Sequence, residues 1–289
     1  MAGNRRPQSI AIMQANVGTG GAAHEIALNL GFENNYDVVC IQEPYIYREL
    51  ERKLTKRHPS YETFTPISEW TSRPRVLTYV RKGRGLKAHQ HVLKGTWENS
   101  ADIVAVRINF LTVYNTYRPP AEAITGPIIS DFSDNPPEPN SVFLGDLNTH
   151  HELWDPDSTR NTGAEHINSW LEQHHLCLIS PPGIPTHDEG AVLDVAFSNV
   201  EGALGFVKEH LHTTSDHQTL GLYIPDQNQS EDTSPKGRFR YDAIHQETFL
   251  WTVRTHLEAT PPNRTSTSRQ RPLPRSYRQQ FKLLPRGHG

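Results

Sequence analysis

GDLNTHHELWDP, residues 145–156, follows directly on the apolar run SVFL at 141–144. The apolar run predicts a short buried strand, and the polar stretch after it predicts a loop. The loop gathers carboxylate, amide and imidazole groups, and loops held by a rigid scaffold are where catalytic groups concentrate. The same residue types also make an ordinary turn, because turns favour Asp, Asn and Gly. The rest of the chain decides between these two interpretations.

Short apolar runs recur along the first 225 residues. They predict strands at 9–17, 37–46, 76–82, 101–109, 111–120, 141–148, 191–198 and 219–224. Helical spacing of apolar residues predicts helices within 20–35 and over 162–176, the first with a buried face of Ala23, Ile26, Ala27 and Leu30. Several linkers are too short for a helical crossover, so neighbouring strands are expected to be antiparallel. The pattern predicts an α/β chain in which two packed mixed β-sheets are flanked by outer helices.

The composition changes near residue 225. Residues 226–289 hold 11 Lys and Arg against 6 Asp and Glu, a net charge of +5, and the remaining 18 basic and 26 acidic residues give 1–225 a net charge of -8. We expect one folded domain over 1–225, followed by a linker with one amphipathic helix at 241–260 and a basic, disordered tail. The acidic balance of the domain does not exclude DNA, because some carboxylates can hold a metal while basic residues line one face.

The two cysteines, Cys40 and Cys177, each lie inside an apolar stretch. We expect both thiols to be buried and reduced, as in a reducing compartment. No Cys and His spacing resembles a zinc motif, and no apolar run approaches the ~20 residues that a membrane span needs. The polar N-terminal residues do not resemble a secretory signal. The sequence therefore predicts an intracellular protein without a membrane partner.

Polar side chains stand at the ends of many of the predicted strands. They are Asn16, Glu43, Tyr117, Asp146 with Asn148, Asp194, and Asp216 with His217. Any one of them has an ordinary explanation as a turn former or a cap. The set as a whole predicts a site, because strand ends in a sandwich of sheets gather at one edge. Glu43 and Asp216 suit Mg²⁺, which prefers oxygen ligands.

These residue types match the needs of phosphodiester cleavage, which requires an oriented water, a stabilised phosphorane and help for the leaving oxygen. Asp146 and Asn148 lie two positions apart, so their side chains point to the same side of an extended segment. One suits proton transfer from water and the other suits binding of a phosphate. His217, kept protonated by a carboxylate such as Asp194, suits hydrogen-bond donation to a phosphate oxygen.

Six motifs stand in order along the chain: QAN (14–16), DVVCIQEP (37–44), YRPP (117–120), GDLNTHH (145–151), LDVAFSN (193–199) and TSDH (214–217). Over roughly 9–225 this set resembles the endonuclease/exonuclease/phosphatase superfamily. Its DNase I-like fold implies a four-layer sandwich of two packed mixed β-sheets flanked by helices. Within the superfamily, the chain is most similar to the apurinic-type endonuclease domain of non-LTR (LINE-type) retrotransposons, with a fungal element as the candidate source.

The resemblance implies a role for each matching residue. It assigns catalysis to Asp146, Asn148, His217, Asp194 and Tyr117. It assigns the metal site, for Mg²⁺ with Mn²⁺ as an alternative, to Glu43, Asp216 and Asn16. It assigns binding of the phosphate or its surroundings to Thr186, Ser215 and Arg118. Glu43 would be the main metal ligand, Asp146 would orient or activate the water, and Asp194 would hold His217.

Three further histidines lie near the predicted site, at His150, His151 and His187. Their spacing supports no tetrahedral zinc set. We expect them to have structural or supporting roles, with His150 the nearest to the site. Trp154 is expected to be a packing residue rather than a platform for a base.

The resemblance implies a Mg²⁺-dependent endonuclease that nicks double-stranded DNA and leaves a 3′-hydroxyl, which in a complete element primes reverse transcription. Two alternatives stay open: a phosphatase of the same superfamily, and a non-catalytic DNA-binding remnant that uses its basic tail. Residues 239–259 resemble the linker to a reverse transcriptase, whose own motifs do not follow. That domain of a parent element is an expected partner, the nucleus is the expected compartment, and the oligomeric state stays open.

Overall fold

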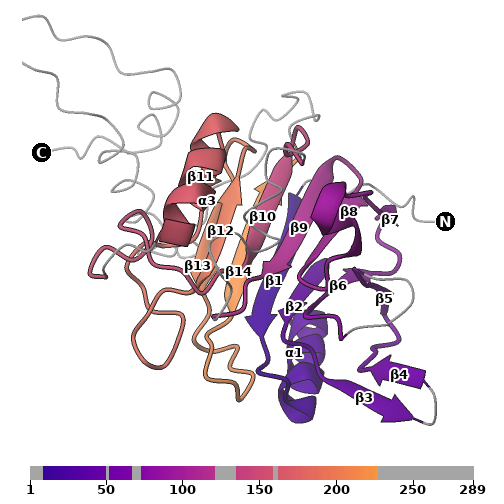
Figure 1. Ribbon diagram of the computed structural model, residues 1–289. Coiled ribbons are helices and arrows are strands. Elements are labelled where there is room, and N and C mark those ends of the chain that lie inside the picture. The colour runs from indigo at the N-terminus through magenta and orange to yellow at the C-terminus, as the bar shows by residue number, and fades with distance from the viewer. Residues whose placement is uncertain (1–8, 50–51, 67–72, 121–134, 159–161, 227–289) are drawn as a thin grey trace, which may run out of the picture. The chain divides into compact units, whose positions relative to one another are not determined.

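The computed structural model describes residues 9–49, 52–66, 73–120, 135–158 and 162–226 (Figure 1). All of them lie within one compact unit, Met1–Asp232. The helix predicted at 241–260 and the basic tail lie outside the described residues. The domain boundary at 225 therefore stays a prediction.

Two six-stranded sheets carry the fold of the described residues. The first has the order β13-β14-β1-β2-β6-β5 and the second β11-β12-β10-β9-β8-β7. The strands of the first are β1 Ser9–Asn16, β2 Val38–Gln42, β5 Tyr61–Phe64, β6 Val76–Arg81, β13 Leu204–Val207 and β14 Leu220–Pro225. Those of the second are β7 Ala88–Gln90, β8 Ile103–Ile108, β9 Leu111–Tyr117, β10 Ser141–Asp146, β11 Cys177–Leu178 and β12 Asp194–Ser198. A separate two-stranded ribbon joins β3 Ile46–Glu49 to β4 Arg52–Thr55.

Each large sheet is mixed. β1 pairs with β2 in parallel and β9 with β10 in parallel, whereas the other pairs of both sheets are antiparallel. Each parallel pair needs a crossover connection, and α1 (Gly21–Glu33) supplies the one between β1 and β2. The predicted mixture of parallel and antiparallel strands is confirmed.

The helices lie on the outer faces of the two sheets. α1 packs on the first sheet, where its buried side chains join a cluster with Met13, Val39 and Ile41. α3 (Thr162–Gln173) packs on the second, next to Phe143 and Phe197. A short 3-10 helix, η1, spans Gly95–Asn99. The order helix, sheet, sheet, helix is the predicted four-layer sandwich. None of the helices in the described part of the chain is long and apolar enough to span a bilayer.

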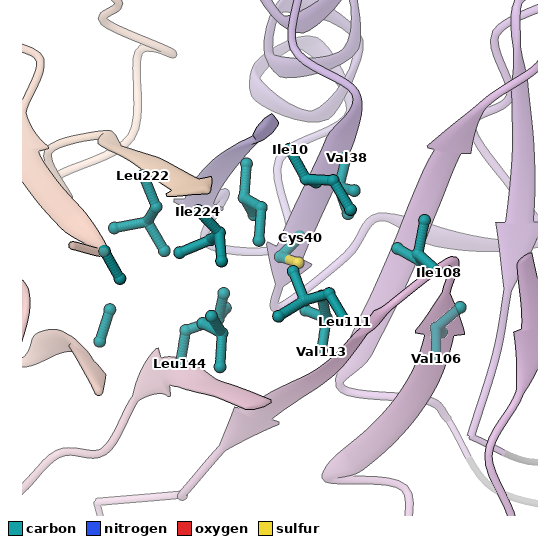
Figure 2. Close-up of a cluster of buried hydrophobic side chains, with 14 of the residues drawn as sticks. Ile10, Val38, Cys40, Val106, Ile108, Leu111, Val113, Leu144, Leu222 and Ile224 are labelled. Carbon is teal, nitrogen blue, oxygen red and sulfur yellow. The ribbon is translucent and has the colours of Figure 1, made fainter. Parts of the chain in front are cut away.

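The main core lies between the sheets. Figure 2 shows Ile10, Val38 and Cys40 of the first sheet facing Val113 and Leu144 of the second. β2 is buried along its whole length because α1 covers one of its faces and the second sheet the other. This double coverage explains why the sequence shows a continuous apolar run there instead of an alternating one.

Two details of side-chain burial differ from the sequence-based expectations. Cys177 is exposed, because β11 is a two-residue strand at the edge of its sheet, whereas Cys40 is buried as expected. The buried face of α1 consists of Ala23, His24, Ala27, Leu28 and Gly31, while the expected Ile26 and Leu30 are only half-buried. The face is rotated because Gly31 lets the helix approach β2, where a Cβ would lie 2.5 Å from Val39 Cγ2.

His24 is a polar member of that face, and its partners explain its burial. Its Nδ1 accepts the Tyr45 N–H at 3.2 Å, and its Nε2 lies 3.0 Å from the Tyr79 hydroxyl. Burial, aided by the charge of Lys56, lowers the pKa of His24 to about 3. The ring is therefore neutral at physiological pH and serves as a core hydrogen-bonding group.

Gly145 fixes the close approach of β10 to β9. In the parallel pairing of the two strands it lies opposite Thr116, and an added Cβ would overlap the carbonyl oxygen of Thr116. Only glycine leaves room for this contact, which sets the position of Asp146 one residue later.

We expect Gly145→Ala to lower the free energy of unfolding by at least ~3 kcal/mol, because the clash is with backbone that cannot rotate away. The measurement is the urea midpoint of unfolding. Gly83→Ala is the matched control, since a Cβ there meets nothing within 4 Å and only the positive φ of +82 is penalised, by about 1 kcal/mol. Equal losses in the two variants would contradict the steric explanation.

Candidate active site

The strand ends of both sheets meet at one edge. Asn16 ends β1 and Glu43 follows β2, and because these strands are parallel the two residues lie at the same edge. In the second sheet, Asp146 at the end of β10 pairs with Tyr117 at the end of β9 and with Asp194 at the start of β12. The pairing places three predicted site residues side by side in one row of the second sheet.

Hydrogen bonds join the two sheets at this edge. Asn16 Nδ2 donates to Asp146 Oδ2 at 2.9 Å, and the Tyr117 hydroxyl donates to Glu43 Oε1 at 3.0 Å. Gln14, two residues before Asn16 and on the same face of β1, has its Nε2 3.3 Å from Asp194 Oδ1. The structure therefore brings together predicted residues that are more than 70 positions apart in the chain.

Asp146 lies deepest in the cluster and is 1% exposed. Its Oδ1 accepts the N–H of Asn148 at 3.0 Å. Burial, followed by the negative charge of Asp194, raises the pKa of Asp146 to about 7, although His217 and the two hydrogen bonds oppose the rise. A carboxyl group that titrates near neutral pH suits proton exchange with a reacting water.

His217 precedes β14 and pairs with Asp194. Its Nδ1 lies 2.7 Å from Asp194 Oδ2, and both side chains are buried. Burial alone would lower the pKa of His217, but the charge of Asp194 and the hydrogen bond to it outweigh burial and raise the pKa to about 9. The ring is an imidazolium at neutral pH, with Nε2 as its second donor.

Asp216 and Glu43 flank the turn at residues 17–19. The Glu43 carbonyl accepts the N–H of Thr19 at 2.8 Å, and a Cβ on Gly18 would lie 3.9 Å from Asp216 Oδ1. Ser215 Oγ lies 3.2 Å from the same carboxylate oxygen. Partial burial raises the pKa of Asp216, but His217 and nearby hydrogen bonds outweigh it and leave the pKa below its usual value.

The oxygen donors at this edge fit a hard divalent cation. They come from Glu43, Asp216 and Asn16, the residues assigned to a magnesium site from the sequence motifs. Glu43 has a left-handed backbone with φ of 47°, which is strained for a residue with a side chain. Strain of this kind clusters at functional sites, where the surrounding structure holds it.

Arg118 and Asn148 bind each other rather than projecting outward. Arg118 Nη1 donates to the Asn148 carbonyl at 3.1 Å, and Asn148 Nδ2 donates to the Arg118 carbonyl at 2.8 Å. Arg118 is buried, and Asn148 is held in the left-handed conformation at φ of 44°. These contacts give Arg118 a role in positioning Asn148, and its predicted contact with substrate stays a prediction.

Thr186 supports the start of β12. Its hydroxyl accepts the N–H groups of Leu193 and Asp194 at 3.0 and 2.9 Å, and the residue is 1% exposed. The observed contacts therefore fix the backbone that carries Asp194. A direct contact of Thr186 with phosphate stays a prediction.

The histidines of the GDLNTHH loop stabilise the loop itself. His150 Nδ1 lies 2.7 Å from Asp155 Oδ2, and the buried His151 ring stacks on Trp154 with centroids 5.1 Å apart. Trp154 is fully buried and donates to the Thr149 carbonyl at 3.0 Å, so it packs as expected.

One residue of the site, Gln14, and one contact of His187 escaped sequence-based prediction. Gln14 is a polar residue inside an apolar strand and two positions from Asn16, a signal that places both on one face. His187 pairs with His217 in an isolated antiparallel bridge and has its Nε2 3.4 Å from Asp216 Oδ2. Nothing in the spacing of the sequence indicates this second contact.

Comparison with known proteins agrees with this geometry. The family described as "Endonuclease-reverse transcriptase" matches residues 111–220, which contain Tyr117, Asp146, Asp194 and His217. No curated protein sequence matches the chain. Among solved structures, the endonuclease domain of TRAS1, a telomere-specific non-LTR retrotransposon, is similar with a TM-score of 0.59 and 19% identity, over 75% of this chain and 98% of that one.

Two further solved structures are also similar. The AP endonuclease LMAP of Leishmania major has a TM-score of 0.56 and 12% identity, over 76% of this chain and 88% of its own. The catalytic domain of Xenopus laevis APE2 has a TM-score of 0.51 and 16% identity, over 75% of this chain and 93% of its own. The expected DNase I-like fold is confirmed, and the family match over residues 111–220 agrees with the expected resemblance to the endonuclease/exonuclease/phosphatase superfamily.

Asp194→Asn tests the origin of the charge on His217. Without the carboxylate, we expect the pKa of His217 to fall from about 9 to near or below the usual 6.5, because burial alone lowers it. The measurement is an NMR titration of the ring protons, with the exposed His166 as the internal reference.

The Asp194–His217 pair also makes the free energy of unfolding depend on pH. Because the pKa of His217 is raised in the folded state, the pair's contribution is full below pH ~6.5 and is lost as the pH rises through ~9. Urea unfolding at several pH values should show this loss in the unsubstituted protein and not in Asp194→Asn. An unchanged His217 pKa in the variant would show that another group supplies the charge.

Proposed function

We propose that this chain is a divalent-metal-dependent endonuclease that hydrolyses one strand of double-stranded DNA and leaves a 3′-hydroxyl. The observation that carries the proposal is the pairing, at one sheet edge, of a carboxyl group that titrates near neutrality with an imidazolium. Asp146 and His217 are these two groups, and the negative charge of Asp194 raises the pKa of each. Hydrolysis of a phosphodiester needs a base for water and a cation for the phosphate, and this pair supplies both.

Glu43, Asp216 and Asn16 would hold the metal, with Mg²⁺ as the expected ion and Mn²⁺ as an alternative. When bound, the ion supplies positive charge to the phosphate oxygens as negative charge develops. Glu43 is also held in place by the Tyr117 hydroxyl, which donates to its Oε1. Burial and the adjacent Glu43 raise the pKa of Tyr117, so the phenol keeps its proton and remains a donor.

Asp146 accepts the proton of the attacking water in this proposal. Asn16 and the Asn148 N–H bind its two oxygens and so fix the direction of its lone pairs. His217 donates from Nε2 to a phosphate oxygen, while its Nδ1 stays bound to Asp194. Asn148, whose backbone carbonyl accepts from Arg118, would contact the phosphate beside Asp146.

DNA as the substrate is supported by the structural similarity to an AP endonuclease and to the endonuclease domain of a telomere-specific non-LTR retrotransposon. The family description also names a reverse transcriptase, which supports such a domain of a parent element as a partner. Priming of reverse transcription would use the 3′-hydroxyl left by the nick. Action on chromosomal DNA would place the protein in the nucleus.

The test is conversion of supercoiled plasmid to the nicked circle with Mg²⁺ and, separately, with EDTA. We expect nicking with Mg²⁺ and none with EDTA. Asp146→Asn and His217→Ala should each lower the nicking rate at least about 100-fold, because each removes a proton donor or acceptor of the reaction. Asp157→Asn and His166→Ala are matched controls at exposed positions and should nick normally.

The other outcomes are also informative. Extension of the nicked plasmid by a DNA polymerase without prior end repair checks the 3′-hydroxyl. Normal nicking by both site variants would refute the assignment of catalytic residues. An inert unsubstituted chain that still retards DNA in EDTA would favour a non-catalytic DNA-binding protein. Turnover of an inositol phosphate without nicking would favour a phosphatase.

A further inference from the structure

His187, Asp216 and His217 form a compact group of metal-binding side chains. Their candidate ligand atoms all lie within 4.8 Å of one another. His187 Nε2 is 3.4 Å from Asp216 Oδ2, and the two imidazole rings are 4.7 Å apart and nearly perpendicular at 79°. His187 is 16% exposed and Asp216 is 61% exposed, so an ion can reach the group from solvent.

The backbone holds these side chains in place. His187 and His217 form an antiparallel bridge. On either side of it, the Asp188 N–H donates to the Asp216 carbonyl at 2.9 Å, and the Gln218 N–H donates to the Thr186 carbonyl at 2.8 Å. The two segments that carry the ligands are therefore fixed relative to each other without an ion.

We propose that His187, Asp216 and His217 form a site for a transition-metal ion such as Zn²⁺, distinct in chemistry from a magnesium site. Two imidazoles and one carboxylate, with a water in the fourth position, match the tetrahedral ligand set of zinc. Imidazole nitrogen favours Zn²⁺ and Co²⁺, whereas Mg²⁺ favours oxygen. Asp194, bound to His217 Nδ1, supplies the carboxylate partner that metal-bound histidines commonly have.

Binding has two local costs. The ion displaces the proton on His217 Nε2, and this proton is released to solvent. The second cost falls on the other histidine. His187 Nδ1 lies 3.2 Å from the Glu189 N–H, a contact in which Nδ1 is the acceptor. Coordination through Nε2 moves the ring proton to Nδ1 and ends this hydrogen bond. The Glu189 amide lies in an exposed turn and can bind water instead.

An ion in this site inhibits the proposed endonuclease, and this consequence rests on the proposed function. The ion occupies Nε2 of His217, the atom that would otherwise donate to the phosphate. It also takes Asp216 away from the magnesium site. Zinc therefore removes two groups from the reaction at once, and it competes with the DNA phosphate for one of them.

The first experiment measures binding without any substrate. Co²⁺ is titrated into the full chain, and the visible absorption of four-coordinate Co²⁺ is recorded, with Zn²⁺ displacing it at the end. We expect these bands in the unsubstituted protein and in His166→Ala, a control histidine on the exposed side of α3. His187→Ala and Asp216→Asn should each bind Co²⁺ at least about tenfold more weakly.

The second experiment measures inhibition of plasmid nicking by Zn²⁺ in excess Mg²⁺. Each variant is compared with its own rate without Zn²⁺. The concentration for half-inhibition should rise at least about tenfold in His187→Ala relative to both the unsubstituted protein and His166→Ala. Circular dichroism confirms that each variant is folded, and His187→Gln repeats the test with a side chain of similar size.

The two readouts separate the proposals. Co²⁺ bands that depend on His187, in a protein that never nicks DNA, would support this metal site and overturn the proposed function. Nicking without these bands, or bands that His187→Ala leaves unchanged, would overturn the metal site alone. Zinc inhibition of equal strength in His187→Ala would overturn the inhibitory role.

Discussion

The ion pair between Asp194 and His217 is the interaction on which the candidate site depends. Asp146 and Asp194 are paired neighbours in the second sheet, and both are almost fully buried. Two buried carboxylates at this distance cannot both stay ionised without a nearby cation. His217 supplies that cation, and its charge opposes the rise in the pKa of Asp146 that burial and Asp194 cause. Loss of the Asp194–His217 pair would change the pKa of Asp146, even though His217 makes no hydrogen bond to Asp146.

A polar layer lies between this row and the apolar core and helps to hold the two sheets together. Gln42 Nε2 donates to Asn115 Oδ1 at 2.6 Å, and Asn115 Nδ2 donates to the Leu77 carbonyl at 3.0 Å and to Thr78 Oγ1 at 3.2 Å. Below it, side chains such as Cys40 and Leu144 pack without polar contacts between the sheets. Directional bonds near the site and close packing below it fix how the sheets are placed against each other.

The sequence predicts the long strands well because their apolar runs are buried on both faces. β10 and β12 were found within a few residues of their ends, since Val142, Leu144 and Ala196 belong to the central core. The sequence did not reveal the separate β3–β4 ribbon, nor the edge strands β5, β7, β11 and β13, which have two to four residues and carry no long apolar run. Edge strands are specified by pairing with a neighbour, and that is a tertiary property.

The site was predictable as a set of residues but not as a geometry. Asn16 and Asp146 stand out as polar residues at strand ends, yet nothing local says that one donates to the other across two sheets. The motif that assigns Arg118 to substrate binding says nothing of its contact with the Asn148 carbonyl, which the buried side chain makes in the structure. His187 reaches His217 through a bridge between two loops. Contacts between residues far apart in the chain depend on strand register and on the order of strands in the sheets, and sequence periodicity does not encode either.

The pairing of β1 with β14 has a consequence for how activity appears during folding. β1 begins at Ser9 and β14 ends at Pro225, so this pairing inside the first sheet forms only after the intervening chain has been made. The contacts Asn16–Asp146 and Gln14–Asp194 span 130 and 180 positions, and contacts of such long range form slowly. A nascent or half-folded chain therefore holds no assembled site, and the proposed cleavage chemistry would be available only to the finished domain.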